Sequence, residues 1–186
     1  MPIVGWMFYF NDAIFLERNW QQDEQTIKEK LERLKRSKMP YKLLIAPEGT
    51  RFTAEKYKIS QEFIAKHGLD VKLKHHLCPR VKGFAATLRQ MNAKNDPHFS
   101  MYNIELVSQV DEKYAEPTIE NFFKGKSFRG DFFVGKIANS EVPEPDADDL
   151  AYADFLYRTF EKKDALVELH QQYHKFPGTV VKQQSN

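Results

Sequence analysis

Residues 43–51 read Leu43-Leu44-Ile45-Ala46-Pro47-Glu48-Gly49-Thr50-Arg51, a short apolar run followed at once by a polar turn. The run has the length and composition of a buried strand, and proline ends it because proline cannot donate to a central ladder. Gly49 lets the backbone turn tightly or approach a ligand closely, and the planar guanidinium of Arg51 fits phosphate oxygens. The pattern predicts a phosphate site where a strand ends.

Strand-like and helix-like patterns alternate on both sides of this turn. Apolar or alternating runs predict strands at 13–16, 42–46, 71–77 and 100–110 and within 125–138, whereas 3–10 could be a strand or a buried helix. Helical spacing predicts helices from Asp23 to just before Pro40, over 60–67 with Gly68 beyond the end, over 85–91 and from 146 to about 173. The alternation favours an α/β fold with parallel crossovers.

Composition limits the class of protein. A chain of 186 residues with 41% hydrophobic and 29% charged residues is typical of one globular domain. The net charge of +2, without a basic block, argues against a nucleic-acid partner, and the single Cys78 excludes an internal disulfide. The longest apolar stretch, Pro2–Phe10, is too short for a spanning helix, so no transmembrane segment is predicted. Because the chain starts in core-like sequence, we expect that a preceding part is missing.

Three basic turns follow candidate strands. They carry Arg18, Arg51, and Arg80 with Lys82. Each arginine taken alone could be an ordinary surface residue. Parallel strands, however, deliver the loops at their carboxyl ends to one edge of a sheet, so the joint pattern predicts that the three turns converge on a phosphorylated ligand.

These turns carry a resemblance to a known family. Ile14-Phe15-Leu16-Glu17-Arg18, Pro47–Arg51 and Cys78-Pro79-Arg80-Val81-Lys82-Gly83-Phe84 resemble, in order and spacing, the second, third and fourth motifs of the glycerophospholipid acyltransferases. The surrounding sequence is similar to the gamma and delta types of the 1-acyl-sn-glycerol-3-phosphate acyltransferases, including the tail Lys162-Lys163-Asp164-Ala165-Leu166 followed by Phe176-Pro177-Gly178. The resemblance implies an α/β fold with a mixed sheet flanked by helices, N-terminally incomplete. Residues 1–178 would form the acyltransferase domain, and 179–186 a polar tail.

The resemblance also implies an activity and roles for residues. Family members transfer an acyl group from acyl-CoA to the free hydroxyl of a lysophospholipid, chiefly 1-acyl-sn-glycerol 3-phosphate, and so form phosphatidate. The matching positions for the acceptor phosphate are Arg18, Glu48, Gly49, Thr50 and Arg51, and those for acyl-CoA or the acceptor are Pro79, Arg80, Lys82 and Gly83. No cofactor is implied beyond acyl-CoA as co-substrate. The expected surroundings are a membrane surface for the longer protein, at the endoplasmic reticulum.

The family's first motif is absent from this chain. That motif is a histidine followed five positions later by an aspartate, and its histidine acts as general base on the acceptor hydroxyl. None of the six histidines here has an aspartate five positions later, so no catalytic residue is assigned. Two interpretations stay open: an enzyme of which this chain is an incomplete part, or a truncated, inactive member that binds phosphate or lipid as an interaction module. A third is an acyltransferase for another lysophospholipid.

The remaining reactive side chains are predicted to be structural. Adjacent His75 and His76 would point to opposite faces of a strand, which favours a solvated or core-packed pair over a metal site. Cys78 beside Arg80 is predicted to be a small buried hydrophobic residue. The acids Asp146, Asp148 and Asp149 suit the start of a helix, and no metal is assigned.

Overall fold

The computed structural model describes residues 13–17, 19–37, 39–115 and 117–178. In chain order its elements are α2 (Trp20–Ser37), α3 (Ala54–His67), α4 (Val81–Met91), β1 (Met101–Val110), β2 (Lys113–Tyr114), α5 (Ile119–Phe123), β3 (Phe128–Ile137), the 3-10 helix η1 (Asn139–Glu141) and α6 (Asp149–Tyr173). Both helices and strands are present, so the predicted α/β class is confirmed. The apolar residues 3–10 lie outside the described ranges.

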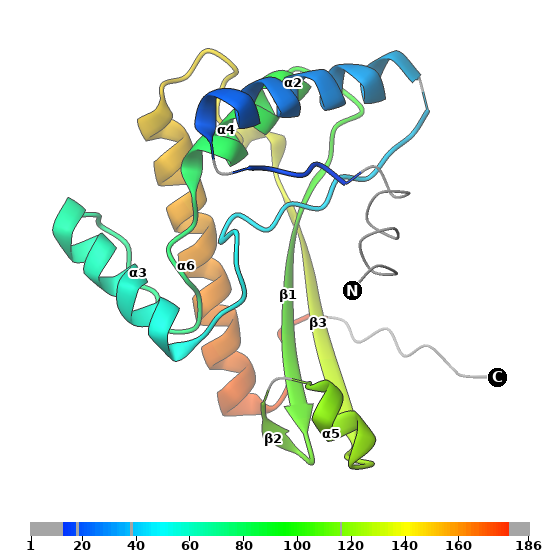
Figure 1. Cartoon of the computed structure of the whole chain (residues 1–186), viewed down its shortest axis with the longest axis vertical. Helices are drawn as coiled ribbons and strands as arrows, with labels where there is room; N and C mark the ends of the chain where they lie inside the picture. Colours follow the sequence, from blue (N-terminus) through cyan, green and yellow to red (C-terminus); the bar gives the residue numbers. More distant parts are fainter. Residues whose placement is uncertain (1–12, 18, 38, 116, 179–186) are drawn as a thin grey trace.

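A long antiparallel hairpin forms the sheet. β1 pairs with β3 from Met101 opposite Ile137 to Val110 opposite Phe128, and the short β2 extends the sheet in the order β2-β1-β3. Figure 1 shows α6 running along this hairpin, while α2 and α4 lie together at one end of it. The sequence had predicted both long strands. Alternation indicated β1, where every second residue points to the same face, and apolar residues among basic ones indicated β3.

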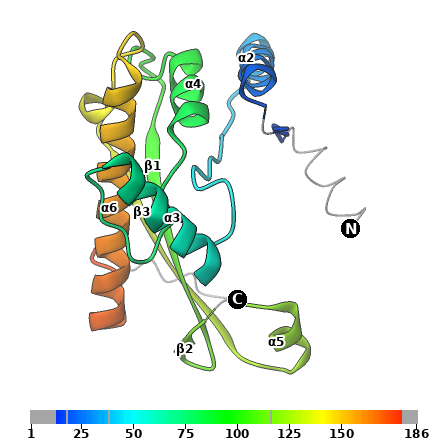
Figure 2. The same cartoon turned by 60° about the vertical axis from the view of Figure 1, so that its left-hand side comes forward.

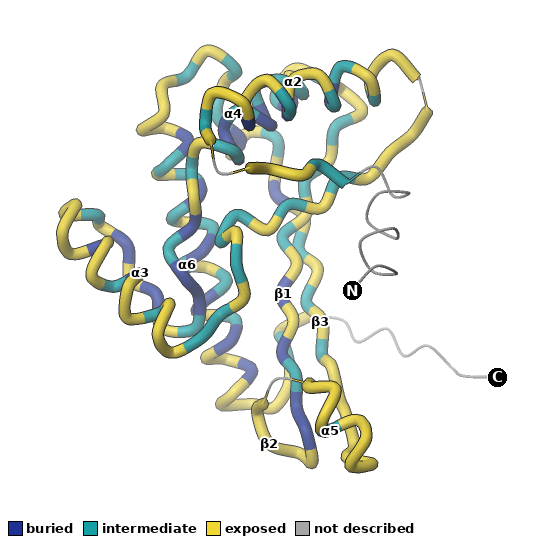
Figure 3. Tube along the Cα trace, viewed as in Figure 1, coloured by how far each residue is buried: buried dark blue, intermediate teal, exposed yellow. Residues whose placement is uncertain are grey.

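The core lies between α6, the hairpin and α4. On α6, Tyr152, Leu156 and Phe160 recur every fourth residue and are almost wholly buried. They share one cluster with Phe84 and Leu88 of α4, and Figure 3 shows the buried residues following the inner sides of these elements. Burial of this apolar stripe holds α6 in place, since most helical stability in proteins comes from packing.

Local signals set the helix ends. The Thr53 hydroxyl accepts a hydrogen bond from the Lys56 N–H at the start of α3, and Gly68 ends that helix in the left-handed region at φ 58°. At the start of α6 the Asp148 carboxylate accepts from the Ala151 N–H, and Asp149 pairs with Arg89. The interpretation of these acids as a helix start is therefore confirmed.

Three predicted strands are wrong. Residues 13–16, 42–46 and 71–77 are not in a ladder, and the described strands pair antiparallel, not through parallel crossovers. The run at 42–46 is not buried as predicted, because Leu44 is 84% exposed and only Ile45 packs against the core cluster. An apolar run becomes a strand only when a neighbouring strand takes its hydrogen bonds, and the sequence does not show that neighbour.

The two faces of the hairpin differ. One face meets α6 and buries Glu105, Val107 and Gln109 of β1. The opposite face is apolar and exposed, and Figure 2 shows α6 on the other side of the strands. This exposed face carries Tyr102, Ile104, Leu106, Phe132 and Val134.

The packing of α6 predicts unequal effects for two leucines of this helix. Leu156→Ala should lower the free energy of unfolding by about 2–5 kcal/mol, because Leu156 is 1% exposed and its loss leaves a cavity. Leu150→Ala is the matched control: Leu150 is 77% exposed, so its change should stay within about 0.5 kcal/mol. Urea unfolding followed by circular dichroism measures both. Equal losses would contradict the described core.

Candidate functional site

Two of the predicted basic turns touch each other. The Arg80 N–H donates to the Pro47 carbonyl at 2.9 Å, and the Arg80 side chain lies against Gly49, where a Cβ would sit 3.4 Å from its Cδ and Nε atoms. Gly49 has a φ of +66°, and its N–H donates to the Ala46 carbonyl at 3.0 Å. The left-handed backbone explains the glycine, because other residues reach this region only with strain.

The other residues of the Pro47 turn have separate tasks. The half-buried Glu48 carboxylate accepts a hydrogen bond from the Leu77 N–H at 2.9 Å, so it connects this turn to the chain just before Pro79. The Thr50 hydroxyl accepts from the Lys56 ammonium of α3. Arg51 is exposed at the end of the turn. The acidic residue is therefore engaged with backbone, while a cation stands at the surface.

The basic turn around Arg80 is the start of a helix. We expected a turn over 80–83, but α4 begins at Val81, with Arg80 as its N-cap and with Lys82 and Gly83 in its first turn. The Arg80 side chain makes no capping hydrogen bond there. The first N–H groups of a helix have no acceptor within the helix and carry partial positive charge. This end of α4 therefore offers donors to an anion, beside two cationic side chains.

The basic turn around Arg18 is known only through its neighbours, because Arg18 lies outside the described residues. The Glu17 N–H donates to the Asp23 carboxylate of α2 at 2.7 Å, and Trp20 begins that helix. The Lys82 ammonium of α4 stands 5.9 Å from the centre of the Trp20 ring. The chain next to Arg18 therefore approaches the start of α4.

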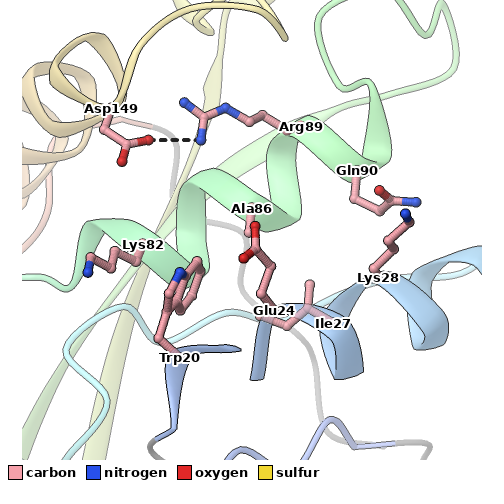
Figure 4. A pocket seen from close by; sticks show the side chains of 9 residues that line it. All are labelled: Trp20, Glu24, Ile27, Lys28, Lys82, Ala86, Arg89, Gln90 and Asp149. Atoms are coloured by element: carbon pink, nitrogen blue, oxygen red, sulfur yellow. Dashed lines mark hydrogen bonds and ion pairs between the residues drawn. The ribbon is translucent and has the colours of Figure 1, made fainter. Parts of the chain in front are cut away.

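A groove runs between α2 and α4, with a volume of about 410 Å³. Figure 4 shows Trp20 and Lys82 at one end of it and Lys28 with Gln90 at the other. Arg89 also lines the groove, but its guanidinium is bound to Asp149 at 2.8 Å. Cations from both helices thus line a groove that starts at the predicted phosphate-binding region.

A group of buried charges was not found by sequence reasoning. The His76 ring lies between two carboxylates, with Nδ1 3.0 Å from Oδ1 of Asp164 and Nε2 3.1 Å from Oε2 of Glu105. The Lys163 ammonium is 3.2 Å from the same Glu105 oxygen. The side chains of His76, Glu105, Lys163 and Asp164 are called the charge cluster below, and they join the segment before Pro79 to β1 and α6.

The charge cluster fixes the protonation of His76. Burial alone would lower the pKa of His76, but the hydrogen bonds to Asp164 and Glu105 outweigh burial and raise the pKa to about 9. Burial would raise the pKa values of both carboxyl groups, yet His76 and other donors hold them below their ordinary values. His76 is therefore a buried cation at neutral pH, which disqualifies it as a general base.

The reactive side chains next to the charge cluster pack against other parts of the protein. His76 is core-packed, and the half-buried His75 faces Glu168 at 3.9 Å. Cys78 packs against the core cluster, and burial raises the pKa of its thiol. Cys78 is half-buried, not buried as predicted, and its raised thiol pKa disfavours the reactive thiolate.

One signal in the sequence could have revealed the charge cluster. Asp164 lies on the apolar stripe of α6, between Phe160 and Val167 at helical spacing. A carboxylate on such a stripe must be paired when it is buried. The tail Lys162–Leu166 had been noted only for its resemblance. Asp164 and His76 are 88 residues apart, so no local spacing in the sequence connects them.

The comparisons with known proteins agree with the motifs. Residues 1–102 match a family model described as Acyltransferase, and residues 121–186 match one described as Acyltransferase C-terminus. The chain is 37% identical over 181 residues to 1-acyl-sn-glycerol-3-phosphate acyltransferase delta of Bos taurus, which covers 97% of this chain. It is 36% identical over 179 residues to the delta protein of Homo sapiens and 33% identical over 178 residues to the gamma protein of Mus musculus, covering 96% of this chain in each case.

The chain spans 45% of the length of each of these relatives. No solved structure matches it.

The raised pKa of His76 predicts a loss of stability at alkaline pH. A cation favoured by folding adds stability that is complete below its ordinary pKa of 6.5 and is lost as pH rises through about 9, a change of roughly 3 kcal/mol. The free-energy difference between wild type and His76→Gln should therefore shrink between pH 6 and pH 9.5. Urea unfolding at both pH values measures it, and titrating groups that are not coupled to His76 cancel in the comparison. A constant difference would show that His76 is not a buried cation.

Proposed function

This chain belongs to the acyltransferase family, and from that premise we propose that it takes part in acyl transfer from acyl-CoA to the free hydroxyl of 1-acyl-sn-glycerol 3-phosphate, giving phosphatidate. The names of the similar delta and gamma proteins support this acceptor. Because the chain spans less than half of their length, the share of the activity that we assign to it is the binding of phosphate.

The contact between the two basic turns carries this proposal. Arg80 lies on Gly49 and donates its N–H to Pro47, so residues from two distant motifs surround one end of α4. A phosphate monoester needs several donors around its oxygens, and helix starts and arginine side chains provide them. Arg51, Arg80 and Lys82 supply the positive charge in this proposal.

The other motif residues would shape the pocket. Glu48 and Gly49 hold the two turns together through the Leu77 N–H and the Arg80 side chain, and Thr50 lies between Gly49 and Arg51. Pro79 is buried just ahead of α4, where Gly83 occupies the first helical turn. We assign Pro79 and Gly83, with Arg80 and Lys82, to acyl-CoA or to the acceptor, and Arg18 to the acceptor phosphate.

A binding function without catalysis is the second candidate for this chain, and the two buried histidines favour it. His76 is a buried cation. His170 is fully buried, with Nε2 2.8 Å from Asp131 and Nδ1 3.2 Å from the Tyr114 hydroxyl. Neither ring can reach an acceptor hydroxyl, although each contacts an aspartate. The longer protein would need its general base from residues other than these.

We further propose that the longer protein works at a membrane surface, at the endoplasmic reticulum, because its acceptor is a membrane lipid. The exposed apolar face of the hairpin is compatible with such a surface. In the ranges that the structure describes, no helix is both long and apolar enough to cross a bilayer.

The purified 186-residue chain should show negligible acyltransferase activity. A missing general base lowers the rate on the order of 10²–10⁴-fold. The test incubates the chain with radiolabelled acyl-CoA and lysophosphatidate and measures phosphatidate against a no-enzyme control. Product well above the control would contradict the prediction and would mean that another residue acts as base.

Arg51→Ala should weaken lysophosphatidate binding by about 10–100-fold, because a charged hydrogen bond contributes about 1.5–3 kcal/mol. Binding of monoacylglycerol, which shares the glycerol and acyl groups but lacks the phosphate, should not change. Titration calorimetry with both lipids in neutral detergent micelles measures this contrast. The control is Arg158→Ala, an exposed arginine paired with Asp154 on α6. Equal losses for the two lipids would assign Arg51 a structural role.

A further inference from the structure

We infer that the charge cluster positions the basic turns around Arg51 and Arg80, with His76 and Asp164 as positioning residues for the phosphate site. The inference rests on the proposed function for what the turns bind, but its geometry is independent of that function. Neither His76 nor Asp164 belongs to the three motifs, and neither side chain lies at the surface.

The backbone of residues 74–80 depends on other parts of the chain for its hydrogen bonds. This segment is not in a strand or helix, so its N–H groups need acceptors other than a ladder. Asp164 supplies two of them: its Oδ2 accepts from the Lys74 N–H and its Oδ1 from the His75 N–H, both at 2.8 Å. A single carboxylate of α6 therefore holds the start of the segment.

Residues of the Pro47 turn and of α3 accept the remaining hydrogen bonds of this segment. The Leu77 N–H donates to Glu48 at 2.9 Å, and the Cys78 N–H donates to the Ser60 hydroxyl at 2.7 Å. The Arg80 N–H then donates to the Pro47 carbonyl at 2.9 Å. Five of the seven residues in this segment thus donate backbone hydrogen bonds, which connect it to Asp164, to α3 and to the Pro47 turn.

The proton on His76 keeps Asp164 charged in this position. Asp164 and Glu105 are both buried, and without a cation between them their charges would repel and remain poorly solvated. His76 contacts both carboxylates. The His76 and Phe160 rings pack edge to face, with their centroids 5.6 Å apart. Lys163 neutralises Glu105 and donates to the Ile104 carbonyl at 2.8 Å, so the charge cluster is also anchored to β1.

Loss of the His76 charge should therefore displace the segment from Asp164 and loosen Leu77 and Arg80. The turn at Gly49 would then lose its two hydrogen bonds to the segment before α4, the Glu48–Leu77 bond and the Pro47–Arg80 bond. The predicted result is a weaker phosphate site without any change in the residues that touch phosphate.

His170 offers a matched control. It is also a fully buried histidine bound to a carboxylate, that of Asp131 on β3. Its other partners are Tyr114 of β2 and the Phe176 ring, whose centroid is 4.6 Å away. Within the described residues, the side chain of His170 contacts Tyr114, Asp131 and Phe176, which all lie outside residues 74–80. Replacing it should therefore disturb a buried histidine of the same kind without touching the turns.

The experiment compares wild type, His76→Gln and His170→Gln in the 186-residue chain at neutral pH. Circular dichroism first checks that each variant is folded. Lysophosphatidate binding in neutral micelles is measured by calorimetry, and amide hydrogen exchange at Leu77 and Arg80 is measured by NMR without ligand. We expect His76→Gln to weaken binding about tenfold and to speed exchange at both amides, and His170→Gln to change binding by less than about twofold. If His76→Gln does not fold, Glu105→Gln, which removes one of the two carboxylates that hold the proton on His76, should speed exchange at both amides and weaken binding about threefold.

The outcomes separate the two proposals. Faster exchange at Leu77 and Arg80 in His76→Gln alone supports the positioning role even if wild type binds no lysophosphatidate, and that second result would overturn the proposed function. Equal effects of His76→Gln and His170→Gln on binding and exchange would overturn the positioning role, because the charge cluster would then contribute stability only. Normal exchange at both amides in His76→Gln, or in Glu105→Gln when that variant replaces it, would overturn it as well.

Discussion

The Asp164 carboxylate satisfies a constraint on which the site depends. Residues 74–80 connect the core to α4 without being in a ladder, and unsatisfied backbone donors in such a place would be costly. Asp164 accepts two of these N–H groups, and it can stay charged inside the protein because His76 is protonated beside it. This arrangement holds the start of α4 in place, and with it the basic turn around Arg80.

Charge is divided between the interior and the surface of this region. The acidic side chains Glu48, Glu105 and Asp164 all point to backbone N–H groups or buried cations. Arg51, Arg80 and Lys82 are exposed near the uncapped start of α4. An anion approaching this surface therefore meets donors, while the nearby carboxylates are already hydrogen-bonded.

The predictions from sequence succeeded where the signal is local. Helical spacing and the Gly68 end signal located α2, α3 and α6, alternation located β1, and phenylalanines and a valine among basic residues located β3. The strands predicted at 42–46 and 71–77 failed because a ladder needs a partner strand that a single run does not specify. For the site, the motifs predicted that the turns around Arg51 and Arg80 meet, although the expected reason, a parallel sheet, was wrong.

The sequence by itself determined the family, the residues of the basic turns and the absence of a histidine and aspartate at the family's spacing. These features depend on residue identity and short spacing, which a chain carries along its length. Only the tertiary structure decided that His76 lies between Glu105 and Asp164, from three elements far apart in the chain. The proton on His76 and the hydrogen bonds from the backbone to Asp164 depend on the proximity of these groups, which exists only after the core has packed α6 against the hairpin.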